Sequence, residues 1–252
     1  FSKVPAAPLP VVADRVDLPD SAGRVELLDF LSPPMRARYA EPSPAVLRFP
    51  PPSPAELPRP CFLVRKGDYA KLVARMLRCG MATLIDDPAC INGLFMVRKK
   101  DSDRCRLILD GRPGSAMFVD PPTMNLPHAG HVASLRLSPD GLAAGPLLHT
   151  AKRDHSNFFY RWRIPAWMRR YLALPRIAVA ELGLSEDELL RFGWRADQVL
   201  FPALVVLAMG HSHSPFLTQD AHEHFVYSRT SLRREDALNG LTDSRLDRLR
   251  HC

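Results

Sequence analysis

The sequence predicts a mixed α+β fold, because three of its stretches carry different apolar patterns. Residues 68–79 have apolar side chains at helical spacing, which favours an amphipathic helix. Residues 94–110 hold two apolar runs around a polar turn, the pattern of a β-hairpin. Residues 199–208 form an apolar run typical of a buried strand, and the pair Ser214-Pro215 that follows is a helix start.

Composition limits the classes of partner. The chain has 252 residues and a formal net charge of +7, with arginine in excess over lysine, which permits a nucleic-acid or phosphate partner. Its five cysteines show no C-x-x-C pair, which favours reduced thiols of an intracellular protein, nuclear or cytoplasmic. No apolar run reaches membrane-spanning length, so no membrane partner is expected. The chain begins with Phe1 and shows no signal peptide, and we expect a piece of a longer protein.

Residues 1–60 hold 14 of the 25 prolines, which predicts an arm or linker. Proline fixes φ and removes a backbone donor, so this density disfavours helix and central strand. Phe49–Pro52 and Pro58–Pro60 favour polyproline II, either as a plain linker or as a ligand for a Pro-binding module. Val25–Leu31 is predicted as one short helix that ends before Pro33 and Pro34.

The helix over 68–79 has a predicted N-cap at Asp68 and a stop at Gly80. After it, Asp86 and Asp87 precede Pro88. Two adjacent carboxylates suggest a metal site, but an Asp-Pro turn explains the pair without a bound metal.

In the hairpin, the polar turn lacks glycine, so its type is open. A turn centred between Ser102 and Asp103 would place Lys99 directly opposite Arg106, with Arg104 on the same face. Like charges that face one another cost stability unless an anion lies between them. The hairpin is therefore either a phosphate clamp or a solvated basic surface.

The rest of the chain yields shorter predictions. A loop-rich stretch covers 111–148, and residues 147–152 are a candidate strand that leads to Asp154. Residues 167–174 form a short element, and 185–192 a helix with a capping box. The last helix has Ser214 as its N-cap and runs to about Tyr227.

Lys152–Pro165 sets one acid, Asp154, among basic and aromatic residues. A carboxylate in that setting suits a hard cation such as Mg²⁺ beside a polyanion, although a turn-capping aspartate would look the same. Four histidines nearby in sequence, His211, His213, His222 and His224, do not predict zinc. A helical His-x-His pair points its rings about 200° apart, and no cysteine completes a zinc spacing.

Three motifs together resemble the fingers and palm of a reverse transcriptase. F-M-V-R-K-K-D-S-D-R-C-R-L-I-L-D-G-R (95–112) resembles the retroelement fingers hairpin, and K-R-D-H-S-N-F-F-Y-R-W-R-I-P (152–165) the palm motif with the first metal-binding aspartate. L-A-M-G-H-S-H-S-P-F-L-T-Q (207–219) is similar to the motif that opens a helix beneath the templating base. The resemblance covers about residues 62–228, with the motifs in the family's order.

The resemblance implies a role for each matching residue. Lys99 and Arg106 match residues that hold the incoming triphosphate, and Asp154 matches the carboxylate shared by two Mg²⁺ ions, or Mn²⁺, in nucleotidyl transfer. Phe159 matches the steric gate against a ribose 2′-hydroxyl, and Gly210 a close approach to the nucleotide. Asp110 and Arg112 match a structural pair of the fingers. Implied partners are an RNA or DNA template-primer and deoxynucleoside triphosphates; no oligomeric state is implied.

The implied organisation is an α+β fold with a fingers hairpin and an incomplete palm, an antiparallel sheet packed on helices. Residues 1–60 are the Pro-rich arm, 61–150 the fingers-like region, 151–230 the partial palm and 231–252 a charged tail.

The sequence departs from the family at the next motif, because no aromatic-x-Asp-Asp follows. With one carboxylate, the chain by itself is expected to be inactive, as a truncated or decayed piece of a retroelement polymerase. Two other functions stay open: a catalytically dead nucleic-acid-binding relic, and an interaction protein that works through its Pro-rich arm.

Overall fold

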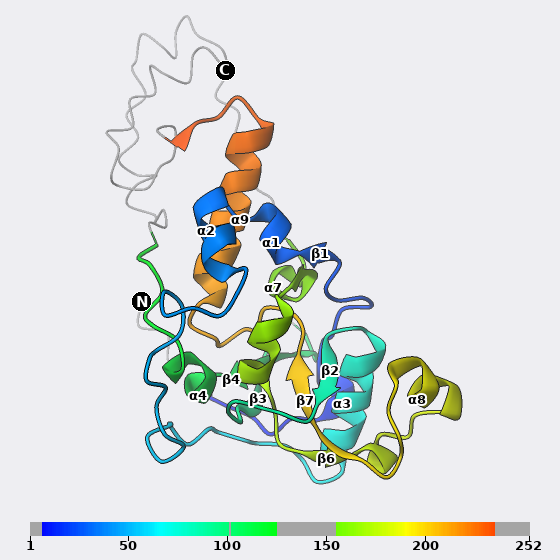
Figure 1. Ribbon diagram of the computed structural model, residues 1–252. Helices are drawn as coiled ribbons and strands as arrows, with labels where there is room; N and C mark the ends of the chain where they lie inside the picture. Colours follow the sequence, from blue (N-terminus) through cyan, green and yellow to red (C-terminus); the bar gives the residue numbers. More distant parts are fainter. Residues whose placement is uncertain (1–6, 101, 125–154, 235–252) are drawn as a thin grey trace, which may run out of the picture.

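The computed structural model describes residues 7–100, 102–124 and 155–234, which form a mixed α+β fold (Figure 1). In chain order the elements are η1 (Ala13–Arg15), β1 (Val25–Glu26), α1 (Leu27–Phe30), α2 (Pro33–Tyr39), α3 (Asp68–Arg78), β2 (Ala82–Ile85), β3 (Gly93–Arg98), β4 (Cys105–Asp110), α4 (Arg112–Ala116), α7 (Phe158–Arg161), β5 (Trp162–Arg163), η2 (Ala166–Leu172), β6 (Ile177–Ala178), η3 (Val179–Leu182), α8 (Glu186–Phe192), β7 (Val199–Leu204) and α9 (Ser214–Arg229). None of these helices is long and apolar enough to cross a membrane.

Helix α3 confirms the apolar stripe read from the sequence. Its buried residues include Leu72, Val73, Met76 and Leu77, and Gly80 ends the segment at φ +75°. The predicted N-cap is wrong, because Asp68 is the first helical residue and Gly67 caps the helix. The Asp68 carboxylate instead accepts a hydrogen bond from the Ala13 N–H (3.1 Å), which ties α3 to the N-terminal segment.

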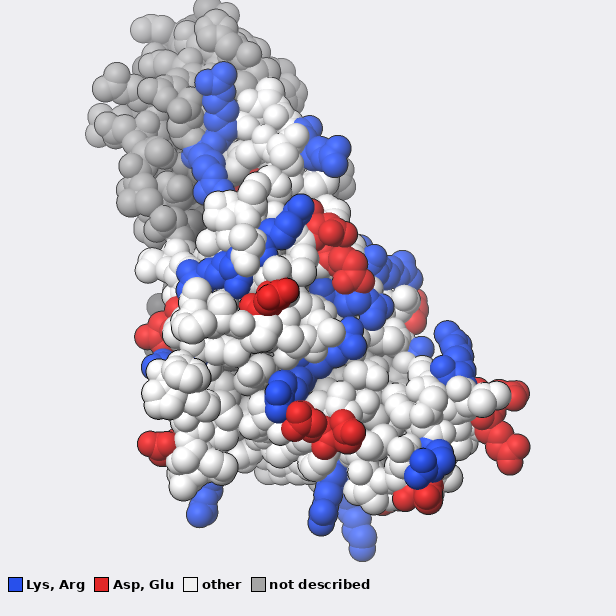
Figure 2. All heavy atoms as spheres, viewed as in Figure 1, with Lys and Arg blue, Asp and Glu red and all other residues white. Residues whose placement is uncertain are grey.

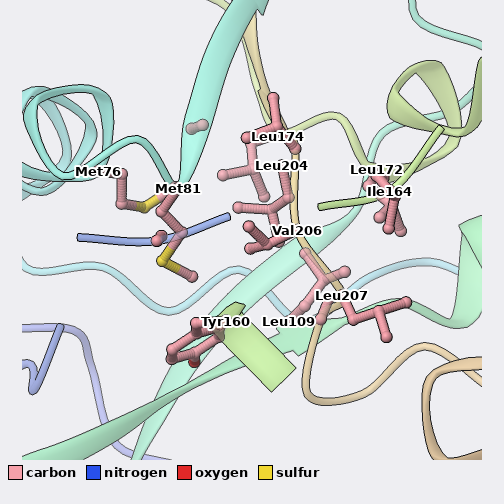
Figure 3. Packing of buried hydrophobic residues seen from close by; sticks show 14 of the residues in the cluster. Met76, Met81, Leu109, Tyr160, Ile164, Leu172, Leu174, Leu204, Val206 and Leu207 are labelled. Carbon is pink, nitrogen blue, oxygen red and sulfur yellow. The ribbon is translucent and has the colours of Figure 1, made fainter. Parts of the chain in front are cut away.

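The buried strand predicted over 199–208 forms over Val199–Leu204 as β7, the middle strand of the antiparallel sheet β2-β7-β6, with its second half buried. Ala82 to Ile85 pair with Leu204 to Phe201. Beyond β7 the chain continues between β2 and β5, where the Leu207 N–H donates to the Trp162 carbonyl (3.1 Å). Side chains from several elements meet here in the core, which Figure 3 shows for Met76, Met81, Leu109, Tyr160, Ile164, Leu172, Leu174, Leu204, Val206 and Leu207.

The N-terminal segment belongs to this core. Val11, Val16, Leu27, Leu31, Tyr39 and Val46 are all fully buried. Two predictions for this segment are wrong. The helix expected over Val25–Leu31 forms only as α1, after the strand β1, so its predicted start is wrong, and Pro33-Pro34 begins α2 instead of only stopping the helix before it. Proline is tolerated in the first helical turn because its missing N–H has no intrahelical acceptor there.

Helix α2 is anchored to α9, far away in sequence. The Asp220 carboxylate on α9 accepts hydrogen bonds from the Ser32 N–H and the Ser32 hydroxyl, both at 2.8 Å. Figure 1 shows α1 and α2 lying along α9. A carboxylate at a helix start satisfies otherwise unpaired N–H groups, so this contact fixes the N-terminal helices on the C-terminal half.

Three further predictions have different outcomes. The capping box of Ser185 and Glu188 is confirmed at the start of α8. Ser214 is not the N-cap of α9, because the helix begins at Ser214 itself and His213 caps it. Residues 111–116 are not simply a loop, since α4 forms there. The candidate strand over 147–152 lies outside the described residues.

Candidate functional site

The hairpin β3–β4 forms as predicted, but in another register. Arg106 lies opposite Val97, and Lys99 pairs with Arg104 through its N–H (3.2 Å to the carbonyl), so the direct pairing of Lys99 with Arg106 is wrong. A shift by two residues keeps every side chain on its face. Lys99, Arg104 and Arg106 therefore still share one face. Cys105, Leu107 and Leu109, on the other face, are buried.

The N-terminal segment contacts this hairpin and selects its register. Leu9 bridges to Met96, and Val16 bridges to Cys105. The apolar pattern alone does not separate registers that differ by two residues, because both bury the same side chains. The two long-range backbone bridges add pairing contacts to both strands of the hairpin in the observed register.

Two of the three basic side chains on this face have partners within the chain. The Lys99 ammonium forms an ion pair with the Asp17 carboxylate. Arg104 donates from Nη1 to the Asp14 carbonyl (3.1 Å). Arg106 is exposed and has no hydrogen bond or ion pair with any described residue. The guanidinium of Arg106 is therefore the cation of this face that is available to an anion.

Helix α7 brings the aromatic segment onto β4. The Tyr160 hydroxyl donates to the Leu107 carbonyl (3.1 Å), and Phe159 is half-buried in the same turn of helix. Burial raises the pKa of Tyr160; Asp17 raises it further and Arg106 lowers it, so both charges lie close to the phenol. Asn157, at φ +54°, turns the chain into α7. Asparagine adopts this left-handed conformation more readily than most residues.

Gly210 packs against the far end of β4. Its φ is +112°, and a Cβ there would lie 2.0 Å from the Leu109 carbonyl oxygen. The Leu109 N–H donates to the Met209 carbonyl (3.0 Å), which holds the two segments together. Glycine is thus required by close backbone packing. The predicted contact of Gly210 with a nucleotide stays a prediction.

Asp110 and Arg112 form a paired structural unit. Arg112 donates to both carboxylate oxygens, from Nε to Oδ1 (2.8 Å) and from Nη2 to Oδ2 (2.6 Å), and the Cys61 N–H donates to Oδ2 (2.6 Å). These hydrogen bonds, chiefly from Arg112, hold the pKa of Asp110 below its usual value. Both carboxylate oxygens of Asp110 are thus engaged in holding Arg112 and the Cys61 backbone in place.

The predicted metal ligand, Asp154, lies outside the described residues. Within the described ranges, no group of three or more His, Cys, Asp and Glu side chains could hold a metal ion. Asp86 and Asp87 lie in the bend after β2, where Asp87 pairs with Arg170 (2.8 Å). Cys61, Cys79, Cys90 and Cys105 are free thiols.

The first two of the four histidines are core residues. His213 makes two contacts: its Nε2 lies 2.8 Å from the Val119 carbonyl, and its Nδ1 lies 2.7 Å from the Tyr39 hydroxyl. A carbonyl only accepts, so Nε2 carries the proton and Nδ1 accepts from Tyr39. His211 is buried edge-on to Phe118 at 4.9 Å, with neither ring nitrogen bonded to a described residue. Burial lowers the pKa of His211 to about 3.

A cavity of about 360 Å³ lies away from the hairpin, between the Pro-rich segment and the η2 region. Its walls include Pro44, Leu47, Met117 and Tyr171. None of the predicted site residues lines it.

Sequence reasoning brought Lys99, Arg106, Phe159 and Gly210 forward. Arg106 lies on β4, Lys99 and Gly210 lie against it or its turn, and Phe159 lies on α7 beside Tyr160, whose hydroxyl bonds to β4. It missed Asp17 and Asn157. Neither had a sequence signal: Asp17 reaches Lys99 only through the pairing of its segment with β4, where its N–H donates to the Cys105 carbonyl (2.9 Å). Tyr160 was noted only as one aromatic among several.

No protein-family model and no curated protein matches the chain. Among solved structures, the foamy viral protease-reverse transcriptase in complex with double-stranded DNA aligns at 13% identity with a TM-score of 0.40, over 68% of this chain and 26% of that chain. A selenomethionine-labelled mutant of the prototype foamy virus protease-reverse transcriptase aligns at 15% identity and a TM-score of 0.40, over 73% and 22% of the two chains. The native prototype foamy virus protease-reverse transcriptase aligns at 16% identity with a TM-score of 0.35, over 69% of this chain and 20% of that chain. The chain spans about a quarter or less of these proteins, and no conclusion about function follows from likeness at this level.

Proposed function

We propose that the chain is part of an RNA-directed DNA polymerase from a retrotransposon-like element. One observation carries this proposal: three segments that resemble separate polymerase motifs meet at one strand, β4. The fingers hairpin contains β4, Tyr160 of the second motif bonds to Leu107, and Gly210 of the third packs on Leu109. These segments are far apart in sequence, so their meeting is independent of the motif resemblance itself.

In this proposal the basic face of the hairpin binds the triphosphate of a deoxynucleotide. Arg106 supplies the free guanidinium, which suits bidentate contacts to phosphate oxygens. Lys99 would join it on release from Asp17. Phe159, next to Tyr160 on α7, would reject the ribose 2′-hydroxyl. Asp154 is the residue that would hold Mg²⁺ or Mn²⁺, which would steady the attacking and leaving oxygens.

The test is nucleotide binding by the full chain, measured by calorimetric titration with Mg²⁺ and deoxythymidine triphosphate. Arg106→Gln should weaken binding about tenfold, the usual worth of one charge-assisted hydrogen bond. Arg98→Gln is the matched control, because Arg98 is an exposed arginine of the same hairpin on the other face. Equal losses in the two variants, or no binding by the unchanged chain, would overturn the proposal.

A second candidate function is a non-catalytic, nucleic-acid-binding relic. The Lys99–Asp17 ion pair favours it, since a carboxylate already neutralises the lysine that a polymerase would give to the triphosphate. Asp17→Asn separates the two functions in the same titration. A polymerase site should bind the nucleotide several-fold more tightly once Lys99 is released, whereas a relic should show no gain.

Catalysis adds a second readout. With Asp154 as the single acid of the two matched palm motifs (152–165 and 207–219), we expect no primer extension by residues 1–252 alone. In a longer chain that does extend primers, Asp154→Asn should abolish extension and leave oligonucleotide binding nearly unchanged. Robust extension by residues 1–252 would contradict the idea that this chain carries only part of the catalytic machinery.

A further inference from the structure

The strands β1 and β5 form a short parallel ribbon whose outer face is rich in arginine. Val25 pairs with Trp162, and Glu26 pairs with Arg163. Trp162 is buried, whereas the side chains of Arg163 and Glu26 are 36% and 58% exposed. Arg24 immediately precedes β1, and Arg161, the last residue of α7, immediately precedes β5; both side chains are exposed.

Arg163 is held in place on this face. Its Nε donates to the Gly23 carbonyl (3.1 Å) and contacts Glu26 Oε1 (3.1 Å). Gly23 has φ +59°, and a Cβ there would lie 3.2 Å from Nη2 of Arg163. The guanidinium thus packs over a glycine, which leaves the two Nη groups without a hydrogen-bond partner among the described residues and fixes their position before any ligand binds.

Arg169, on η2, adds a charge beside Arg163. Burial lowers the pKa of Arg169, and Arg163 lowers it further while Glu26 raises it, so all three charges are close together. The Nε of Arg169 is buried and has no hydrogen-bond partner among the described residues. A buried charged donor without an acceptor costs free energy, and an incoming anion would relieve the repulsion between the two guanidinium groups.

We name Arg24, Arg161, Arg163 and Arg169 the arginine cluster. Arg24 has no hydrogen bond or ion pair with any described residue, and among those residues Arg161 donates only to a backbone carbonyl, that of Ser156 (3.0 Å). Among the described residues, Glu26 is the acid that forms an ion pair with the cluster. Figure 2 shows basic side chains gathered across the middle of the face on which Figure 1 places α1, β1 and α7, with a few acidic ones among them.

We propose that the arginine cluster binds the phosphodiester backbone of a polynucleotide. Guanidinium groups match phosphate oxygens in bidentate geometry, and several of them on and beside one ribbon suit a repeating anion. A lipid surface fits less well, because none of the exposed large apolar side chains of the described residues belongs to β1, β5, α7 or η2; they are Phe49, Phe62, Leu190, Val199, Phe225 and Leu232. The identity of the ligand rests on the proposed function; the anion site itself rests on the geometry.

The test is binding of a fluorescent 20-nucleotide oligothymidine to the full chain, followed by anisotropy over a range of salt concentrations. The double variant Arg163→Gln/Arg169→Gln should bind about tenfold more weakly at 0.1 M salt. The slope of log affinity against log salt should fall by about 1.4, from about 0.7 for each phosphate contact of a single strand. Arg191→Gln/Arg195→Gln, at α8, removes the same charge from another surface and should change neither quantity.

Two single variants keep the test decisive if the double variant does not fold. Glu26→Gln removes the acid beside Arg163 and should strengthen binding about threefold, a gain that misfolding does not produce. Arg24→Gln removes an exposed, unpartnered side chain and should weaken binding about threefold. The inference is falsified if both leave the affinity unchanged, or if the control pair weakens it as much as the double variant.

Other partners are outcomes of the same experiment. If polyglutamate competes as well as an oligonucleotide of equal charge, the surface is one for acidic peptides and the inference is wrong. If the cluster variants lose binding to phosphatidylserine vesicles and keep the oligonucleotide, it is a lipid surface. Failure here leaves the proposed function standing, because nucleotide affinity through Lys99 and Arg106 is measured separately. Loss of that nucleotide site would likewise leave the cluster's result intact.

Discussion

At the scale of single residues, Gly210 shows how packing and function compete to explain one position. Alanine there would combine a positive φ of +112° with a Cβ placed 2.0 Å from the Leu109 carbonyl oxygen. We expect Gly210→Ala to lower the free energy of unfolding by more than about 2 kcal/mol, because backbone strain and a clash add. Urea denaturation followed by circular dichroism measures this loss.

Gly183→Ala is the matched control for that variant. Gly183 has a positive φ of +60°, but no atom lies within 4 Å of its ideal Cβ. Gly183→Ala should therefore lower the free energy of unfolding only by the strain of the left-handed conformation, about 1 kcal/mol. Equal losses at both positions would show that the contact of Gly210 with β4 contributes nothing, and its glycine would then need another reason, such as the nucleotide contact.

A buried histidine gives a pH dependence with a definite sign. Burial first, and His213 second, lower the pKa of His211 from 6.5 to about 3. Below pH 6.5 the unfolded chain therefore binds a proton that the folded chain does not bind until pH falls to about 3. The stability that His211 contributes is complete above pH 6.5 and is lost as pH falls, by about 1.4 kcal/mol per pH unit.

Urea midpoints measured between pH 7 and pH 4.5 test this slope. His211→Phe should flatten the profile, since phenylalanine carries no proton and keeps an aromatic ring against Phe118. An exposed histidine replaced in the same way, His222→Phe, should leave the slope unchanged. A profile of the same steepness in the chain and in His211→Phe would show that other groups cause the acid sensitivity.

At the scale of elements, local patterns predicted well where local chemistry decides the structure. The stripe of α3, the capping box of α8 and the hairpin β3–β4 all form as the sequence indicates. Each depends on residues within one or two turns or on one pair of strands. Pro33-Pro34 was ambiguous in the sequence, because proline is common both just after a helix and in its first turn. The contact that supports a helix start there, between Asp220 and Ser32, is long-range.

The candidate site was less predictable, because its decisive contacts are long-range. The hairpin's face was predicted correctly, since residue parity fixes it. Its register was not, since a glycine-free turn does not choose between registers two residues apart. The Asp17 partner of Lys99 had no local signal, because it depends on how the N-terminal segment crosses β4.

At the scale of the whole molecule, the N-terminal segment joins parts that the motifs describe separately. It contacts the hairpin through Leu9 and Val16, and α9 through Ser32. Its seven fully buried side chains, the six named above and Ala13, contribute on the order of 10 kcal/mol of apolar burial. That is comparable to the net stability of a typical domain, so the segment is part of the folding unit although its composition resembles a linker.

Two aromatic residues of this segment test that conclusion directly. Tyr39 is fully buried and its hydroxyl bonds His213, whereas Phe49 is 85% exposed. We expect Tyr39→Ala to cost about 3–5 kcal/mol of unfolding free energy, through the cavity and the unpaired histidine nitrogen. Phe49→Ala, with as large a truncation, should stay within about 0.5 kcal/mol.

Chemical denaturation of both variants decides between an integral segment and an arm. An arm that merely lies on the surface would tolerate both substitutions alike, because neither residue would support the core. A large loss confined to Tyr39→Ala would instead place residues near position 39 inside the cooperative unit. Any effect of removing residues 1–60 on partner binding would then report unfolding of the whole chain, so deletion of that segment does not test a role for its prolines in recognition. Substitutions at exposed positions such as Phe49 are the ones that do.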